Sequence, residues 1–199
     1  MIRASAVRLL AIGATSLGVL AAVAGSPRKD SSPSIDVAAL ARDVQTEADH
    51  VTAIELARWI RDRKPNLRII DIRDSAEFGR YHVPQAERLP IEEVVKASFN
   101  PGETIVLYSG GGAHAAQAWV LLRTRGEKNV FFLRGGVSEW LDEVMNPQAP
   151  AHLSGQARDE ADSVAALSRY FGGVPRQVDS AVPIQSFKAA TARVRGRGC

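Results

Sequence analysis

Residues 109–114 have the composition and the position in the chain of an anion-binding loop. They follow an apolar, β-branched run at 104–107 that is typical of a buried strand, and a helical run at 115–125 follows them. A chain that turns through glycines from a strand into a helix leaves backbone N–H groups unpaired, and the helix N-terminus carries partial positive charge. We therefore predict that an anion binds in this loop, which consists of Ser109, Gly110, Gly111, Gly112, Ala113 and His114.

A second pair of residues that could do chemistry, Asp71 and Arg73, follows another short β-branched run at 67–70. Strands alternate with helices along the central part of the chain, a pattern that predicts a mostly parallel sheet with helices on both faces. Ligands of such sheets bind at the carboxyl ends of the strands. Because Asp71, Arg73 and the 109–114 loop all follow strands, we expect them at the same edge of the sheet.

Ser109 and His114 permit a second interpretation, a hydrolase in which the histidine is the base for a serine nucleophile. Such a site needs an orienting acid, for which Asp71 is the candidate, and an oxyanion site that converges on the same atoms. The position of His114 at the start of the helix argues against it, because an imidazole there donates to a bound anion or faces solvent. No cofactor or metal site is expected, because the four histidines are scattered and neither a CxxC nor an HExxH motif occurs.

The composition is that of a globular protein with an export signal. Of 199 residues, 45% are hydrophobic and 24% are charged, and the net charge of +3 is too small to predict nucleic-acid binding. Arg3 and Arg8 precede an uncharged apolar run at 9–24 that ends in a small-x-small sequence. Whether this segment is cleaved or is retained as a membrane anchor, it places the domain outside the cytoplasm, in the periplasm or on the membrane.

Four segments are predicted along the chain. Residues 1–24 form the signal peptide or anchor, 25–47 a linker, 48–145 a single three-layer α/β domain, and 146–199 a basic, partly helical extension. The extension combines a proline-containing break, a helical pattern at 156–171, and four basic residues without acids from Gln185 onward. The single cysteine, Cys199, has no partner for an internal disulfide and permits one between chains.

Several short segments, in this order and at this spacing, resemble the rhodanese-like domain over residues 48–144. They are the strand end Ile70-Asp71-Ile72-Arg73, the segment His82-Val83-Pro84-Gln85-Ala86, which is similar to the family's His-Ile-Pro-Gly-Ala, and Leu133-Arg134-Gly135-Gly136 with Trp140. The resemblance implies the three-layer rhodanese fold. It also implies that Asp71 and Arg73 are structural residues that tie neighbouring loops together.

In active members of that family a cysteine heads the loop and carries sulfur as a persulfide, and an arginine five residues later helps to hold the anionic donor. Here Ser109 stands at the cysteine position, His114 at the arginine position, and Gln85 at the position of a glycine. A serine hydroxyl stays protonated and cannot carry a persulfide. The same two loop changes count against phosphoryl transfer, which related folds perform with a cysteine-headed loop that ends in arginine.

Two functions remain open from the sequence. The first is a non-catalytic module of the cell envelope that binds a small, thiosulfate-like anion or a partner protein. The second is a thiosulfate-type sulfurtransferase in which Cys199 supplies the missing thiol. The first is favoured, because a thiol at a chain end is not preorganised and loses most of the benefit of orientation.

Overall fold

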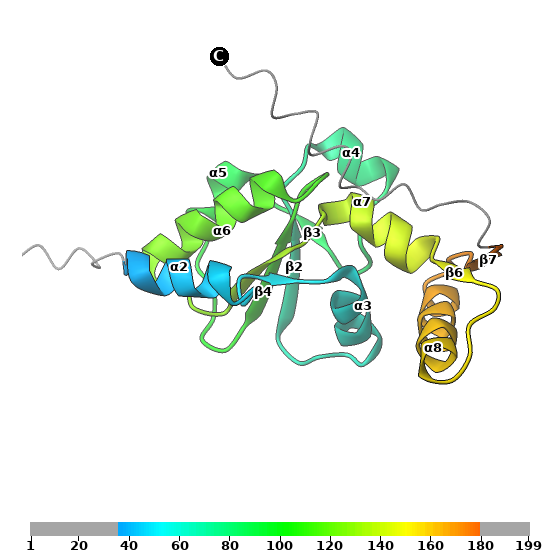
Figure 1. Cartoon of the computed structure of the whole chain (residues 1–199). Coiled ribbons are helices and arrows are strands. Elements are labelled where there is room, and N and C mark those ends of the chain that lie inside the picture. The colour runs from blue at the N-terminus through cyan, green and yellow to red at the C-terminus, as the bar shows by residue number, and fades with distance from the viewer. Residues whose placement is uncertain (1–35, 180–199) are drawn as a thin grey trace, which may run out of the picture. The chain divides into compact units, whose positions relative to one another are not determined.

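A computed structural model describes residues 36–179 of the chain, in which five strands form one parallel sheet (Figure 1). The strands are β1 (His50–Val51), β2 (Leu67–Asp71), β3 (Glu87–Arg88), β4 (Thr104–Tyr108) and β5 (Val130–Leu133). Their order in the sheet is β1-β5-β4-β2-β3, and every neighbouring pair is parallel. The predicted parallel α/β sheet is confirmed, and the strand before the 109–114 loop is its central strand.

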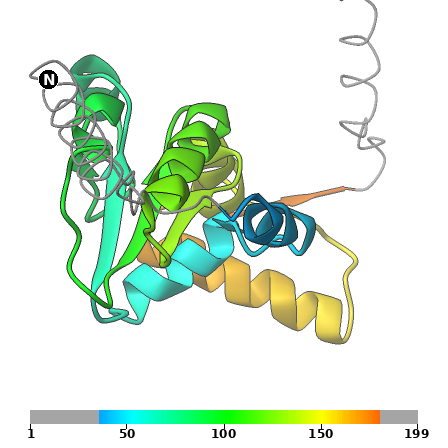
Figure 2. The same ribbon diagram turned by 90° about the vertical axis from the view of Figure 1, so that its left-hand side faces the viewer.

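Helices cover both faces of this sheet. They are α2 (Val37–Gln45), α3 (Ala53–Arg61), α4 (Ser75–Arg80), α5 (Ile91–Val94), α6 (Ala113–Arg125), α7 (Gly136–Trp140), the π-helix η1 (Leu141–Met145) and α8 (Gln156–Tyr170). Figure 1 shows α2, α5 and α6 on one side of the strands and α3, α7 and α8 on the other. Figure 2 shows α8 beside α3, against which it packs.

Helix α3 begins at a capping box, for which Thr52 and Glu55, three residues apart, are the sequence signature. The Thr52 hydroxyl accepts a hydrogen bond from the Glu55 N–H (3.1 Å), and the Glu55 carboxylate accepts one from the Thr52 N–H (2.9 Å). The hydrogen bond from the Thr52 backbone lowers the pKa of Glu55. Two donors at the helix start are thereby satisfied, and Leu56 and Ile60 on the same helix are buried against the sheet.

Alternating side chains of the strands supply one apolar cluster on each face of the sheet. The cluster under α3 and α7 contains buried strand and helix residues: Leu56, Ile60, Ile69, Val106, Tyr108, Leu133, Trp140 and Val144. The cluster under α5 and α6 contains Ile70, Val94, Ile105, Leu107, Ala118, Trp119, Leu122 and Val130. Both faces are therefore closed, which leaves the edges of the sheet for ligands.

The described part of the predicted linker contains a helix, α2, that joins the second cluster. The Asp36 carboxylate caps this helix by accepting from the Ala39 N–H (2.8 Å). Arg123 of α6 donates to the Asp43 carboxylate (2.5 Å), and Leu40 packs against the cluster. The described part of the predicted linker, from Asp36 onward, therefore packs against the domain.

The described part of the C-terminal extension also packs against the domain. The helix predicted at 156–171 is present as α8, and Leu167 of this helix is buried in the first cluster. Phe171 packs edge-on against Trp140, with ring centroids 5.3 Å apart. Strands β6 (Gln148–Pro150) and β7 (Arg176–Val178) pair in parallel beside α8.

The predicted signal peptide or anchor, the first part of the linker and the basic tail with Cys199 lie outside the described residues. Among residues 36–179, no helix combines the length and the apolar character that a membrane crossing requires.

Candidate functional site

The 109–114 loop connects the central strand β4 to helix α6. Ser109 follows the strand directly and is 3% exposed, while Gly112 adopts φ +88° and caps the helix. The Ser109 Oγ accepts a hydrogen bond from the Gly112 N–H (3.1 Å). Positive φ at Gly112 is what allows the chain to turn from the strand into the helix, and a side chain there would be strained.

The loop carbonyls are held by the start of helix α7. The Val137 N–H donates to the Ser109 carbonyl (2.9 Å), and the Ser138 N–H and hydroxyl both donate to the Gly110 carbonyl (3.1 Å each). This contact is close because Gly136 has no side chain, since a Cβ there would lie 2.2 Å from the Ser109 carbonyl oxygen. In the sequence, Gly136 stands out only as part of the Leu133-Arg134-Gly135-Gly136 segment, and its role in holding the loop was missed.

Most of the loop N–H groups, in contrast to the loop carbonyls, have no hydrogen-bond partner within the described residues. Within residues 36–179, the N–H groups of Gly110, Gly111, Ala113 and His114 donate no hydrogen bond. They lie at the N-terminus of a helix of 13 residues, where the macrodipole adds positive potential. Unpaired N–H groups at a helix N-terminus are the feature on which the predicted anion site depends, and the binding of an anion stays a prediction.

The serine–histidine hydrolase is not assembled in this geometry. The His114 side chain is exposed and makes no hydrogen bond or ion pair with the described residues, and Ser109 Oγ is bonded to Gly112. Asp71, the candidate orienting acid, is bonded to Arg73 instead. No hydrogen bond in the described part of the chain therefore joins a nucleophile, a base and an acid.

Asp71 and Arg73 form a buried ion pair at the end of β2. Asp71 is fully buried, and its carboxylate accepts from the Arg73 Nη2 (2.6 Å), Nε (2.9 Å) and backbone N–H (2.9 Å). The same Nη2 donates to the Tyr81 carbonyl (2.7 Å). The bond to Asp71 raises the pKa of Arg73. The pair joins the end of β2 to the chain that leaves α4.

Two tyrosine hydroxyls bond the segment after α4 to strand β4 and to helix α7. The Tyr108 hydroxyl accepts from the Val83 N–H (3.1 Å), and burial raises the pKa of Tyr108 well above its ordinary value. The Tyr81 hydroxyl accepts from the Trp140 Nε1 (2.7 Å), and burial raises its pKa as well. Both phenols stay protonated near neutral pH. The His82 ring stacks on that of Phe78, with the ring centroids 4.1 Å apart, and its Nδ1 lies 3.0 Å from the Phe78 carbonyl oxygen.

Gln85 lies in a turn that prefers glycine. The Ala86 N–H donates to the Val83 carbonyl (3.0 Å), and Gln85, after Pro84, has φ +67°. Proline followed by positive φ is the signature of a type II turn. We expect Gln85→Gly to raise the free energy of unfolding by about 0.5–1 kcal/mol, because the left-handed conformation is unfavourable for a residue with a Cβ.

Urea unfolding measures this effect, with Gln117→Gly as the matched control. Gln117 lies on the exposed side of α6, where glycine lowers stability by about 0.5–1 kcal/mol. Equal losses in the two variants would show that Gln85 is not strained.

Metal binding has no support in the described part of the chain. No group of three or more His, Cys, Asp or Glu side chains within residues 36–179 lies close enough together to hold a metal ion. No cofactor is assigned to the site.

The fold and the loop define a class of protein: a parallel α/β domain with a glycine-rich loop between its central strand and the helix that follows. The family model of the rhodanese-like domain matches residues 52–143 of this chain. A sulfurtransferase from Allochromatium vinosum is 32% identical over 84 residues, which cover 41% of this chain and 78% of that protein. The chain therefore belongs to the rhodanese-like family.

Other relatives share the same region. The probable adenylyltransferase/sulfurtransferase MoeZ of Mycobacterium tuberculosis is 29% identical over 103 residues, 47% of this chain. The chain spans 25% of the length of that relative. Among solved structures, a rhodanese-like domain from Anabaena is 29% identical, with a TM-score of 0.43 over 46% of this chain and 72% of that one. A rhodanese-like domain protein from Staphylococcus aureus is 27% identical, with a TM-score of 0.43 over 48% and 93% of the two chains.

Proposed function

We propose that this chain is an exported rhodanese-like protein that does not transfer sulfur and binds an anion in its 109–114 loop. The anion is either free or carried by a partner protein of the cell envelope. The observation that carries the proposal is Ser109: it heads the loop, is buried, and accepts a hydrogen bond from the Gly112 N–H. By the family resemblance, this is the position of the persulfide-carrying cysteine.

The change from thiol to hydroxyl turns the head of the loop from an attacking group into a binding group. A thiolate attacks sulfane sulfur and would repel a bound oxyanion by its charge. The Ser109 hydroxyl is neutral, and because its oxygen accepts from Gly112, its hydrogen is available to donate. Together with the N–H groups of Gly110, Gly111, Ala113 and His114, it supplies five donors for one anion.

Export is supported by the sequence of the first 24 residues. Arg3 and Arg8 followed by the apolar run at 9–24 give the charge and hydropathy pattern of an export signal. A thiosulfate-like anion or an anionic group on an envelope protein fits that location and the loop chemistry. This part of the proposal is tested by fractionation of cells that make the full chain, with the protein expected outside the cytoplasm.

Anion binding is measured by calorimetry with thiosulfate and sulfate. We expect Ser109→Ala to weaken binding by about 2- to 10-fold, the value of one hydrogen bond, and Ser154→Ala, an exposed serine in the extension, to leave it unchanged. If the wild-type chain bound neither thiosulfate nor sulfate, that result would contradict the proposed function of the loop.

Sulfur transfer is measured with thiosulfate and cyanide. The wild-type chain and Cys199→Ser are expected to be inactive, while Ser109→Cys combined with His114→Arg gains activity on the order of 100-fold over background, because it restores the nucleophile and a fixed cation. Ser154→Cys is the control: it places a thiol elsewhere on the surface, and we expect it to stay inactive. Wild-type activity that Cys199→Ser abolishes would instead show a sulfurtransferase that uses the terminal thiol.

A further inference from the structure

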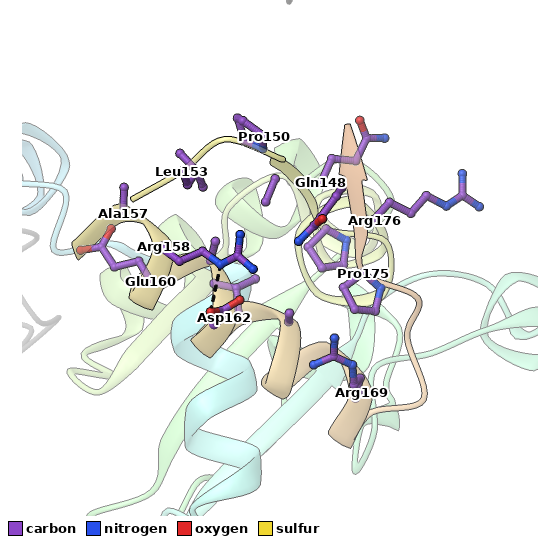
Figure 3. Close-up of a pocket in the computed structure, with 16 residues that line it drawn as sticks. Gln148, Pro150, Leu153, Ala157, Arg158, Glu160, Asp162, Arg169, Pro175 and Arg176 are labelled. Atoms are coloured by element: carbon purple, nitrogen blue, oxygen red, sulfur yellow. Dashed lines mark hydrogen bonds and ion pairs between the residues drawn. The ribbon is translucent and has the colours of Figure 1, made fainter. Parts of the chain in front are cut away.

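A groove of about 330 Å³ lies between helix α8 and the paired strands β6 and β7 (Figure 3). It belongs to the described part of the C-terminal extension and shares no residue with the 109–114 loop. Its volume lies at the lower end of the range of small-molecule pockets, about 300–1,000 Å³. Pockets of this kind combine an apolar lining with a few polar groups that orient the ligand, so the lining indicates which class of ligand fits.

The floor of the groove is an apolar row on α8. Ala157, Ala161 and Ala165 stand four residues apart and therefore lie one above another on one side of the helix, with Val164 beside them. From Ala157 to Ala165 the row extends about 12 Å along the helix axis. The walls add further apolar side chains: Pro147, Pro150, Leu153 and Pro175. The groove thus offers an apolar surface long enough for an alkyl chain.

The hydrogen-bonding groups of the lining favour an alkyl chain over a peptide. Alanine and valine side chains have no polar atom, and proline has no N–H, so the floor and the prolines donate nothing to a peptide carbonyl. Gln148 and Gln177 are the uncharged donors among the lining side chains. Carbonyl groups that are buried without a donor cost free energy, whereas an alkyl chain needs no donor and gains from leaving water.

Arg169 continues the alanine row at one end of the floor. It stands four residues after Ala165, and Figure 3 shows it at the opposite end of the groove from Ala157. Long side chains in a helix are directed toward its N-terminus, which for Arg169 is toward the floor. Within residues 36–179 the Arg169 side chain forms no hydrogen bond or ion pair. Its guanidinium therefore has donors free for a carboxylate, which it can bind through two parallel hydrogen bonds.

The acidic residues of the lining determine the direction of a bound carboxylate. Asp162 is paired with Arg158 (3.1 Å), and Glu160 forms no ion pair with the described residues. Both acids lie on turns of α8 that precede Arg169, and Glu160 is about 14 Å from it along the helix axis. A carboxylate is therefore repelled at the Glu160 end of the groove and attracted at the Arg169 end.

We propose that the α8 groove binds an aliphatic monocarboxylate, whose alkyl chain lies over the alanine row and whose carboxylate pairs with Arg169. The inference does not depend on the proposed anion loop, because the two sites share no residue. It gives the C-terminal extension a ligand that differs from a small oxyanion in needing both an apolar chain and a charged end.

Calorimetry with octanoate on the full chain tests this proposal. We expect acetate, which lacks the chain, and 1-octanol, which lacks the charge, to bind at least about 10-fold more weakly than octanoate. Arg169→Met is expected to weaken octanoate binding by about 10- to 100-fold, the effect of losing a hydrogen bond between charged groups.

Arg176→Met is the matched control for the arginine. Arg176 also lines the groove and forms no ion pair with the described residues, but Figure 3 shows it directed away from the rest of the lining. We expect this variant to change octanoate binding by less than about 2-fold, because an exposed charge that does not touch the ligand contributes little.

Filling the groove provides a second test. Ala161→Phe places a ring on the floor and is expected to weaken octanoate binding at least about 10-fold by steric exclusion. Ala166→Phe, at an exposed position of the same helix outside the lining, is expected to leave it unchanged. In the wild-type chain, nuclear Overhauser effects are expected between the octanoate methyl group and the Ala157 or Ala161 methyl group. Thermal unfolding of both variants checks that they fold.

Other outcomes overturn the proposal. Absence of octanoate binding, or binding that Arg169→Met leaves unchanged, would show that the groove is not a monocarboxylate site. Octanoate that is displaced by thiosulfate, or that binds more weakly to Ser109→Ala, would be bound in the 109–114 loop instead. A capped Leu-Ala-Leu-Ala-Asp peptide that binds more tightly than octanoate, and that Arg169→Met weakens, would assign the groove to a partner protein.

Discussion

A Gly136→Ala variant is expected to lose about 2–4 kcal/mol of folding free energy and most of its anion binding. The added Cβ would lie 2.2 Å from the Ser109 carbonyl oxygen, 2.7 Å from that of Gly110 and 2.8 Å from the Gly112 nitrogen. All three are backbone atoms, which cannot rotate aside as the end of a side chain can. Gly136 also has φ +60°, which is unfavourable for alanine whatever the space.

Gly79→Ala is the matched control for this change. Gly79 lies in α4, has ordinary helical φ, and no atom lies within 4 Å of the position of its missing Cβ. We expect this variant to be as stable as the wild type or up to about 1 kcal/mol more stable. Urea unfolding and calorimetry with thiosulfate measure both variants. A Gly136→Ala protein that unfolds and binds like Gly79→Ala would contradict the close approach of α7 to the loop.

An Arg73→Met variant is expected to lose about 3–5 kcal/mol, the usual cost of leaving a buried charge without its partner. Asp71 is fully buried and receives four hydrogen bonds from the side chain and backbone of Arg73, while the Arg73 side chain is only 8% exposed. The substitution also removes the donor to the Tyr81 carbonyl. The segment after α4 therefore loses its link to β2 at the same time.

Two further variants separate charge from packing. Asp71→Leu with Arg73→Met removes both charges, and we expect it to be more stable than Arg73→Met alone, because no unpaired charge remains. Arg158→Met breaks the exposed pair with Asp162, and the expected loss is within about 0.5 kcal/mol. Denaturant unfolding measures all three. A loss in Arg73→Met as small as that in Arg158→Met would show that the buried pair contributes little to the fold.

The sequence was enough to predict those parts of the site that depend on neighbours along the chain. The strand, the glycines and the helix around the 109–114 loop are contiguous, so their order alone predicts a loop whose N–H groups are unpaired. The capping box of Thr52 and Glu55 is equally local, because its two residues are only three positions apart in the chain. The alternation of strands and helices predicts a parallel sheet, because parallel strands need helical crossovers.

The supporting contacts could not be predicted in this way, because they join residues that are distant in the chain. Gly136 and Ser138 hold a loop that begins at Ser109, and nothing near Ser138 indicates that its hydroxyl donates to Gly110. Strands β1 and β3 have only two residues each, which is too short for an alternating pattern. The packing of α2 was missed because it depends on Asp43 meeting Arg123 of α6.

Trp140 connects the C-terminal extension to the interior of the domain, since its ring packs against Phe171 and its indole N–H donates to the Tyr81 hydroxyl. Separating α8 from the domain would expose both this ring and Leu167 to water. Proteins open in cooperative units whose boundaries follow such buried contacts. Helix α8 and the sheet are therefore expected to unfold in one transition, with the central amides of α8 exchanging at the rate of global unfolding rather than by fraying from the end of the helix.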